Sequence, residues 1–90
     1  MIDDQYDNLR KELNKTKIWP IVYMFKFIVP ADNRTRAMVV SKFSDDSVIT
    51  TKESTNGKYS SITIKEVMLD AEAIIAKYKE MDGIEGLISL

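Results

Sequence analysis

The chain has 90 residues, of which 44% are hydrophobic and 30% charged, so it can form one globular domain with a single core. Its 13 Lys and Arg residues against 14 Asp and Glu residues argue against a general nucleic-acid binder, which usually carries a basic excess. The absence of cysteine and histidine removes disulfides, thiolate chemistry, and the commonest metal ligand and general base. We therefore expect no catalytic residue, no metal site and no cofactor.

The start of the chain and its apolar runs predict neither a secretory signal nor a membrane-spanning segment. Residues 1–4 are acidic and lack the basic and apolar regions of a secretory signal. The longest apolar run, residues 18–25, is too short to span a bilayer. We expect a cytoplasmic protein with no membrane partner.

Residues 3–14 are predicted to form an amphipathic helix, because apolar residues recur at helical spacing behind an aspartate that can cap it. The recurring residues are Tyr6, Leu9 and Leu13, and the cap is Asp3 or Asp4. A lone helix of this length is marginal in water, so it must either dock, on its own sheet or on a neighbouring molecule, or fray. Residues 1–18 are assigned to this helix and a polar linker, and residues 19–90 to the main domain.

Residues 21–29 form the best strand in the sequence, since β-branched and aromatic residues fill them and Pro30 ends them. Trp19-Pro20 ahead of the strand predicts an extended entry, because the residue before proline is pushed out of the helical region. Both faces of the strand are largely apolar, which is typical of a central strand, and Lys26 is the exception. One face carries Tyr23, Phe25, Phe27 and Val29, and the other carries Val22, Met24, Lys26 and Ile28.

A helix is expected next, from Asp32 or Asn33, either of which can cap it, to about Phe43. Its inward stripe is predicted to consist of Met38, Val39, Lys42 and Phe43. Residues 47–52 alternate weakly between apolar and polar side chains and are predicted to form a short strand nearer the sheet edge.

Asn56-Gly57 predicts a type I′ hairpin turn, because both residues tolerate positive φ. In the strand that follows, residues 58–68, side chains alternate between two unlike faces. Ile62 and Ile64 are predicted to point into the core. The opposite face carries Tyr59, Ser61, Thr63 and Lys65.

The clearest helical pattern lies between Asp70, a good N-cap, and Gly83, a good left-handed stop. Its apolar residues are Ala71, Ile74, Ile75, Tyr78 and Met81. Residues 84–90 are expected to close the domain as a strand, with Ile84, Gly86, Ile88 and Leu90 on one side.

The order of elements is a helix followed by β-α-β-β-α-β. This order predicts an α+β fold, the ferredoxin-like sandwich, with a four-stranded antiparallel sheet and two helices on one face. Right-handed crossovers place the first and third strands in the middle of the sheet. Those two strands are also the longest and the richest in β-forming residues.

A set of motifs in residues 19–90 is moderately specific when its members are taken together. They are Trp19-Pro20, Tyr23-Met24-Phe25-Lys26-Phe27-Ile28, Ser54 with Gly57-Lys58-Tyr59-Ser60-Ser61-Ile62, Ile74 with Tyr78, and Gly86-Leu87-Ile88-Ser89-Leu90. The set resembles the small bacterial YbeD-like family, an uncharacterised family with a ferredoxin-like fold similar to the ACT regulatory domains. The resemblance implies that fold and a ligand-sensing or partner-binding role, and it supplies no catalytic residues.

The main candidate binding surface is the sheet face predicted to lie opposite the helices. It combines Met24, Lys26 and Ile28 of the first strand with Tyr59, Ser61, Thr63 and Lys65 of the third. Such a face can receive a protein partner, a second copy or a small ligand, or it can be a solvated face whose cross-strand pairs support the sheet. The apolar pair Met24 and Ile28 favours protein contact. A strand edge at which two copies pair is an alternative surface.

A candidate anion site lies at the start of the helix after the first strand, where Asn33 and Arg34 could hold phosphate. Arg34 with either Asn33 or Asn56 would support an acylphosphatase-type hydrolase on the same fold. The junction has no glycine to let a ligand approach the backbone, and Asp32 adds negative charge, so a capped helix start is the simpler interpretation.

Single-stranded RNA binding through Tyr59 and Lys26 is a further alternative, since RNA-recognition motifs share the βαββαβ order. The third strand offers one aromatic residue on this face and lacks the glycine and further aromatics of the RNP1 pattern. The sequence therefore favours a non-enzymatic regulatory or interaction module.

Overall fold

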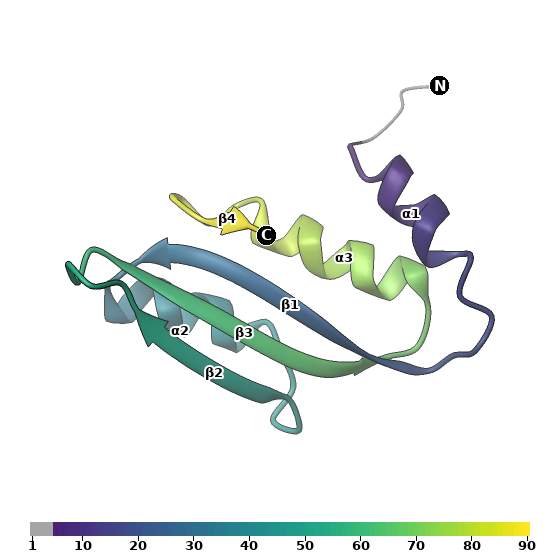
Figure 1. Cartoon of the computed structure of the whole chain (residues 1–90), viewed down its shortest axis with the longest axis horizontal. Helices are drawn as coiled ribbons and strands as arrows, with labels where there is room; N and C mark the ends of the chain where they lie inside the picture. Colours follow the sequence, from purple (N-terminus) through teal and green to yellow (C-terminus); the bar gives the residue numbers. More distant parts are fainter. Residues whose placement is uncertain (1–4) are drawn as a thin grey trace.

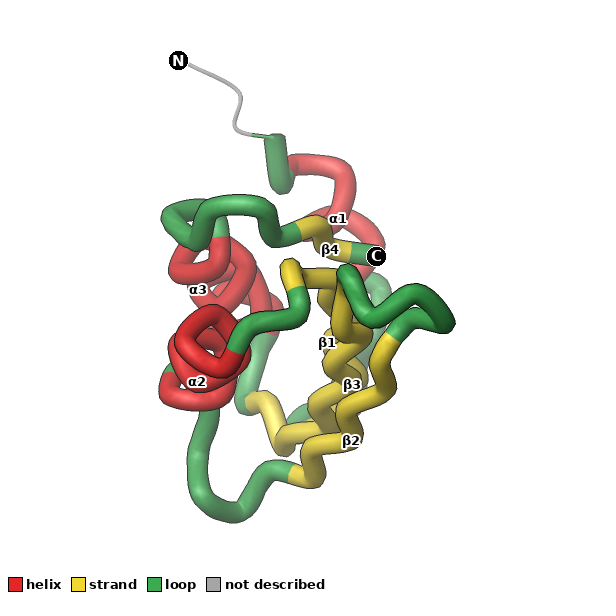
Figure 2. The backbone as a smooth tube through the Cα atoms, turned by 90° about the vertical axis from the view of Figure 1, so that its left-hand side faces the viewer, coloured by secondary structure: helices red, strands yellow, loops and turns green. Residues whose placement is uncertain are grey.

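The computed structural model describes residues 5–90, which form one antiparallel sheet and three helices (Figure 1). The elements are α1 (Asp7–Leu13), β1 (Ile21–Pro30), α2 (Asn33–Ser41), β2 (Val48–Glu53), β3 (Tyr59–Met68), α3 (Ala71–Met81) and β4 (Ile88–Ser89). The strands follow the order β2-β3-β1-β4, so β1 and β3 are central, as predicted. Figure 2 shows α2 and α3 together on one side of the sheet, which confirms the predicted ferredoxin-like sandwich.

The core lies between the sheet and these two helices. Ile62 and Ile64 of β3 are 0% exposed, as the alternation predicted. Phe25 of β1 is also 0% exposed, and its ring contacts the rings of Phe43 and Tyr78 at centroid distances of 5.2 and 5.3 Å. Burial of each large apolar side chain contributes roughly 1.5–3 kcal/mol, so this layer supplies most of the drive to fold.

The register of the sheet separates the two faces of each strand. β1 pairs with β3 along its whole length, from Ile21 opposite Met68 to Pro30 opposite Tyr59. β2 pairs with β3 from Val48 opposite Lys65 to Glu53 opposite Ser60. Because paired residues share a face, one face of the three strands points to the helices and the other away from them.

α1 packs on α3, so of the alternatives left open by the sequence the helix docks on its own domain. The Arg10 guanidinium lies 2.7 Å from the Glu72 carboxylate, and the Tyr6 ring stacks on Tyr78. The helix begins at Asp7 and ends at Leu13, so it is shorter than predicted. The proposed caps at positions 3 and 4 lie outside the described residues.

α2 is capped by Asp32, as predicted, but it ends at Ser41. Val39 and Phe43 are buried, whereas Met38 is 41% exposed and Lys42 is also exposed, so the predicted inward positions of Met38 and Lys42 are wrong. One residue advances a helix by about 100°, which turns Met38 away from the side that Val39 presents to the sheet.

The hairpin between β2 and β3 is not the predicted type I′ turn. Among residues 5–90 no residue other than glycine has a positive φ, and Gly57 has φ +71°. The Gly57 N–H donates to the Ser54 carbonyl at 2.9 Å. The Asn56 side chain accepts from the Ser54 hydroxyl at 2.9 Å and from the Lys58 N–H at 3.0 Å. These bonds hold the turn with only glycine in the left-handed region.

The end of the chain also departs from the prediction. α3 starts after the Asp70 cap as expected, but Gly83 does not have a positive φ; Gly86 does, at +81°. Ile84 turns back into the core and is 7% exposed, so the predicted strand over residues 84–90 is wrong. The chain reaches the sheet late, and β4 consists of only Ile88–Ser89.

Candidate functional site

The face of the sheet that α2 and α3 leave uncovered is here named the open sheet face. It is made of the side chains that the register turns away from the helices. These are Val22, Met24, Lys26 and Ile28 of β1, Val48, Thr50 and Lys52 of β2, Tyr59, Ser61, Thr63, Lys65 and Val67 of β3, and Ile88 with Leu90 at the C-terminal end.

The structure brings all seven residues of the predicted binding face together. Met24 lies opposite Lys65, Lys26 opposite Thr63, and Ile28 opposite Ser61. Tyr59 lies opposite Pro30 at the end of the same pairing and is 48% exposed. That these residues bind a partner stays a prediction.

The open sheet face is wider than the sequence indicated. β2 adds Val48 and Lys52, and the C-terminal end adds Ile88 and Leu90. The alternation in the β2 segment was a usable signal, whereas the position of β4 depends on long-range pairing. Exposed apolar side chains are frequent here, with Val22 at 65% and its cross-strand partner Val67 at 58%.

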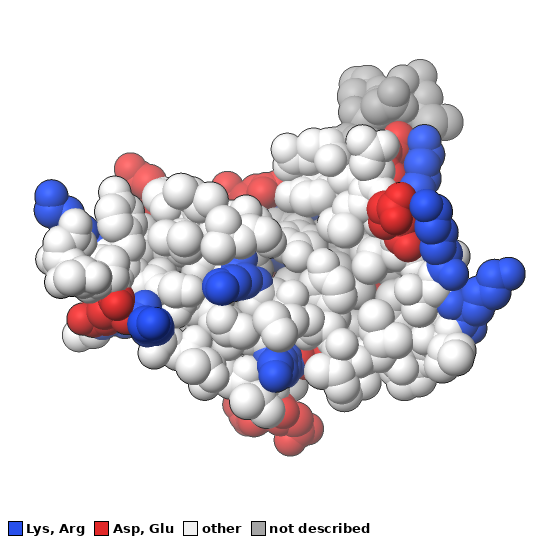
Figure 3. Space-filling view, viewed as in Figure 1, with Lys and Arg blue, Asp and Glu red and all other residues white. Residues whose placement is uncertain are grey.

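The charge on this face is of one sign. Its ionisable side chains other than tyrosine are Lys26, Lys52 and Lys65, and the register places no Asp or Glu side chain among them. Within residues 5–90 none of the three lysines forms an ion pair. In Figure 3, which looks onto this face, blue side chains stand on a largely white surface over the strands. The face is therefore basic although the whole chain has a net charge of −1.

Two hollows lie at the ends of the open sheet face. One, of about 550 Å³, has apolar walls from Val22, Val48 and Val67, and its charged lining is Lys65, Lys77, Asp46 and Glu66. The other, of about 250 Å³, is lined by Ile28 and Tyr59 together with Lys52, Glu53 and the start of the hairpin loop. Each hollow thus offers apolar walls beside lysine and carboxylate side chains.

The candidate anion site does not assemble into a cationic pocket. Asn33 and Arg34 are both exposed at the start of α2, and the Asn33 side chain accepts a hydrogen bond from Arg36. The nearby hollow is lined by Arg34 but also by the carboxylates of Asp32 and Glu85.

Asp32 serves as the helix cap instead. Its carboxylate accepts from the Thr35 N–H at 2.7 Å and from the Thr35 hydroxyl at 2.9 Å. The bond from the Thr35 backbone is the main reason that the pKa of Asp32 is lowered, so the carboxylate stays charged and repels an anion.

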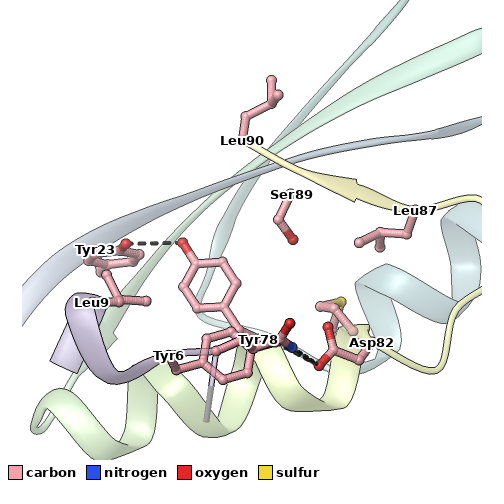
Figure 4. Close-up of a pocket in the computed structure, with 10 residues that line it drawn as sticks. Tyr6, Leu9, Tyr23, Tyr78, Asp82, Leu87, Ser89 and Leu90 are labelled. Carbon is pink, nitrogen blue, oxygen red and sulfur yellow. Dashed lines mark hydrogen bonds between the residues drawn. The ribbon is translucent and has the colours of Figure 1, made fainter. Parts of the chain in front are cut away.

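A second concave region, missed by the sequence reasoning, lies between α1, α3, β1 and the C-terminal end of the chain (Figure 4). We name it the tyrosine cleft. It has a volume of about 550 Å³. Its lining is Gln5, Tyr6, Leu9, Tyr23, Tyr78, Met81, Asp82, Leu87, Ser89 and Leu90. These residues are far apart in the chain, and no motif joins them.

Hydrogen bonds between hydroxyl and carboxylate groups order the lining of the tyrosine cleft. The Tyr23 and Tyr78 hydroxyl oxygens lie 3.0 Å apart. Burial, followed by this hydrogen bond, raises the pKa of Tyr78 well above its ordinary value. The Tyr6 hydroxyl and the Gln5 amide both donate to one carboxylate oxygen of Asp82, at 2.7 and 3.1 Å.

The family model of a protein of unknown function, DUF493, matches residues 14–89. The chain belongs to this family. No curated protein and no solved structure matches the chain. Membership in DUF493 confirms the uncharacterised-family part of the resemblance, while the YbeD-like and ACT-like relationship stays a prediction.

As the description of DUF493 names no activity, the family adds no residue roles to the geometry. Within residues 5–90 no group of three or more carboxylates is placed to hold a metal ion. The same part of the chain has no helix long and apolar enough to cross a membrane. The open sheet face and the tyrosine cleft are the two surfaces from which a function can be argued.

Proposed function

We propose that this domain is a non-enzymatic interaction module whose open sheet face binds an acidic, partly apolar surface of a partner protein. One observation carries the proposal: exposed apolar side chains surround three lysines, and the nearest carboxylates, those of Asp46, Glu53 and Glu66, line only the two hollows at the ends of the face. Exposed apolar area of this kind commonly marks a protein interface.

The arrangement of apolar side chains supports a protein partner over a small ligand. The two hollows stand at opposite ends of the face, so a single small molecule would not fill both. Interface energy usually comes from a few anchoring side chains that enter such hollows, surrounded by contacts that exclude water. A protein surface can place one anchor beside Val22 and Val67 and another beside Ile28 and Tyr59.

The lysines indicate that the contact surface of the partner is negatively charged. Lys26, Lys52 and Lys65 would attract a surface rich in Asp and Glu and would speed its association. They also argue against two copies meeting face to face, because that contact would set lysines against lysines. RNA shares the negative charge, but Tyr59 is the only aromatic side chain on the face available for stacking.

The test is affinity capture followed by measurement with the purified partner. We expect the native chain to retain an acidic protein, and Lys26→Glu with Lys65→Glu to weaken binding of that protein about tenfold or more. Lys11→Glu with Lys17→Glu, two charge reversals outside the open sheet face, is the matched control and should bind as the native chain does. Affinity should fall as salt is raised.

Equal binding by the native chain and the double variant would contradict this proposal. A single-stranded RNA oligonucleotide is measured in parallel. Salt-dependent RNA binding that is lost in Tyr59→Ala would contradict a protein partner and would show that the face binds RNA.

A further inference from the structure

β1 has a free edge beside the short β4. β4 pairs only with Phe27 and Ile28, and the Leu90 N–H then donates to the Lys26 carbonyl at 2.9 Å. The earlier part of β1 continues past this point without a strand on that side (Figure 1).

The free edge presents unpaired backbone groups. In an antiparallel strand the N–H and C=O of one residue point to the same side, and the side alternates along the chain. Because the Lys26 carbonyl points toward β4, the N–H and C=O of Val22 and Met24 point to the same edge. Within residues 5–90 no backbone group is bonded to them there. Unpaired edges of this kind are the sites at which extended peptides add to a sheet.

The tyrosine cleft lies beside this edge. Tyr23 of β1 lines it between Val22 and Met24, and Ser89 with Leu90 line its other end. Figure 4 shows Tyr6, Tyr78 and Asp82 reaching into the region between β4 and the helices. A strand that continued the line of β4 along β1 would turn every second side chain into this cleft.

The charge of the cleft indicates which side chain fits. Among the described residues that line the cleft, Asp82 is the only lysine, arginine, aspartate or glutamate. Among residues 5–90 no cation lies within ion-pair distance of its carboxylate. Arginine suits the remaining lining, because its guanidinium stacks on tyrosine rings and pairs with a carboxylate.

We propose that the β1 edge and the tyrosine cleft form a peptide-binding site. An extended segment of a partner adds antiparallel to β1 in line with β4, bonds to the backbone of Val22 and Met24, and places an arginine in the cleft near Asp82. This site uses the backbone edge of β1 and the helix side of the sheet, shares only Leu90 and the Val22 and Met24 backbone with the open sheet face, and goes beyond the function proposed for that face.

The probe is the capped heptapeptide Thr-Val-Thr-Arg-Thr-Val-Thr, titrated to millimolar concentration and followed by NMR of the backbone amides. We expect saturable shifts centred on Val22 and Met24, and amide exchange at both residues slowed about tenfold or more at saturation. Absence of these changes, with this peptide and with a version carrying glutamine for arginine, would overturn the proposal.

Two N-methylated peptides form a matched pair that leaves the protein unchanged. In antiparallel addition the residues bonded to Val22 and Met24 share their face, so they are threonines, while the arginine lies opposite Tyr23. Methylation of the two threonine nitrogens beside arginine should abolish binding, and methylation of the arginine nitrogen should preserve it. Equal binding of the two methylated peptides would overturn strand addition.

The carboxylate is tested separately from the edge. Asp82→Asn keeps an oxygen for Tyr6 and Gln5, and it should weaken the arginine peptide about threefold to tenfold while leaving the glutamine peptide unchanged. An equal effect on both peptides would contradict the placement of arginine.

Light scattering decides between a peptide and a second copy. A native dimer that Met24→Pro converts to a monomer, but that Lys26→Glu with Lys65→Glu leaves intact, would mean that β1 pairs with itself, which would overturn the peptide assignment. The open-face variant Lys26→Glu with Lys65→Glu should still show the peptide-induced changes at Val22 and Met24. The two proposals can therefore fail independently.

Discussion

The two faces of β1 are both largely apolar but lie in opposite environments. On the face toward the helices, Phe25 and Ile64 are 0% exposed. On the open sheet face, the neighbouring residues Met24 and Val22 are 53% and 65% exposed. Apolar composition alone therefore does not distinguish a core from an interface. Packing of α2 and α3 makes one face a core, and the other keeps an apolar surface that folding does not require.

The largest expected difference between the faces is in stability, and adjacent positions of β1 test it. Phe25→Ala should lower the free energy of unfolding by about 3–5 kcal/mol, because a buried ring is lost and a cavity remains among the aromatic side chains. Met24→Ala should cost less than about 1 kcal/mol, since that side chain is largely in water. Urea unfolding followed by circular dichroism measures both values.

Phe25→Ala could leave too little folded protein to measure, because small domains are stable by only about 5–15 kcal/mol. Ile64→Val is the milder core variant and should cost about 0.5–1.5 kcal/mol. Costs of similar size at Phe25 and Met24 would mean that the open sheet face is buried in solution, and the comparison between the faces would fail.

The second expected difference is in binding. Val22→Thr together with Val67→Thr keeps the side-chain shape of a cross-strand pair but makes it polar. Stability should change by less than about 1 kcal/mol, because both side chains are more than half exposed, while partner affinity should fall about tenfold. Calorimetry with the purified partner measures the affinity.

Val40→Thr on α2 is the matched control for this pair. It makes the same chemical change at a partly exposed valine that does not belong to the open sheet face. It should leave partner affinity unchanged. Equal losses of affinity from the control and from the double variant would show that the open sheet face is not the contact surface.

Local sequence patterns predicted the elements whose form depends on local physics. The alternation around Ile62 and Ile64 indicated the buried face of β3, and the cap of α3 followed from Asp70 ahead of a helical pattern. All seven candidate residues of the open sheet face were brought together for the same reason. Alternation and strand order together determine which side chains share a face.

Features that depend on tertiary contacts were not predictable in this way. Gly86, rather than Gly83, has a positive φ, and a side chain there would meet Pro30, so the close approach of two segments decides the turn. β4 is short because Ile84 is buried before the chain reaches the sheet. The tyrosine cleft joins Tyr6, Tyr23 and Tyr78 from three separate elements, and no spacing rule connects residues so far apart.

The smallest expected effect concerns Tyr78 of α3, on the helix side of the sheet. Its ring is part of the core, and its hydroxyl lines the tyrosine cleft. At pH 7, Tyr78→Phe should cost about 0.5–1.5 kcal/mol, because the hydrogen bond to Tyr23 is lost. The pKa of Tyr78 is raised in the folded protein. The stabilisation linked to its protonated hydroxyl is therefore full below about pH 10, the pKa of an unfolded tyrosine, and is lost as pH rises above it.

The difference in stability between native protein and Tyr78→Phe should therefore shrink above about pH 10, since only the native chain must keep this buried hydroxyl protonated. Urea unfolding of both proteins from pH 7 to 11 measures the difference, and titration of the lysines cancels in the comparison. Tyr59→Phe, which removes an exposed hydroxyl on the open sheet face, should change stability at pH 7 by less than about 0.5 kcal/mol. A native-to-Tyr78→Phe difference that stays constant across this range would mean that the Tyr78 hydroxyl is open to water, and that the cleft does not bury it beside the core.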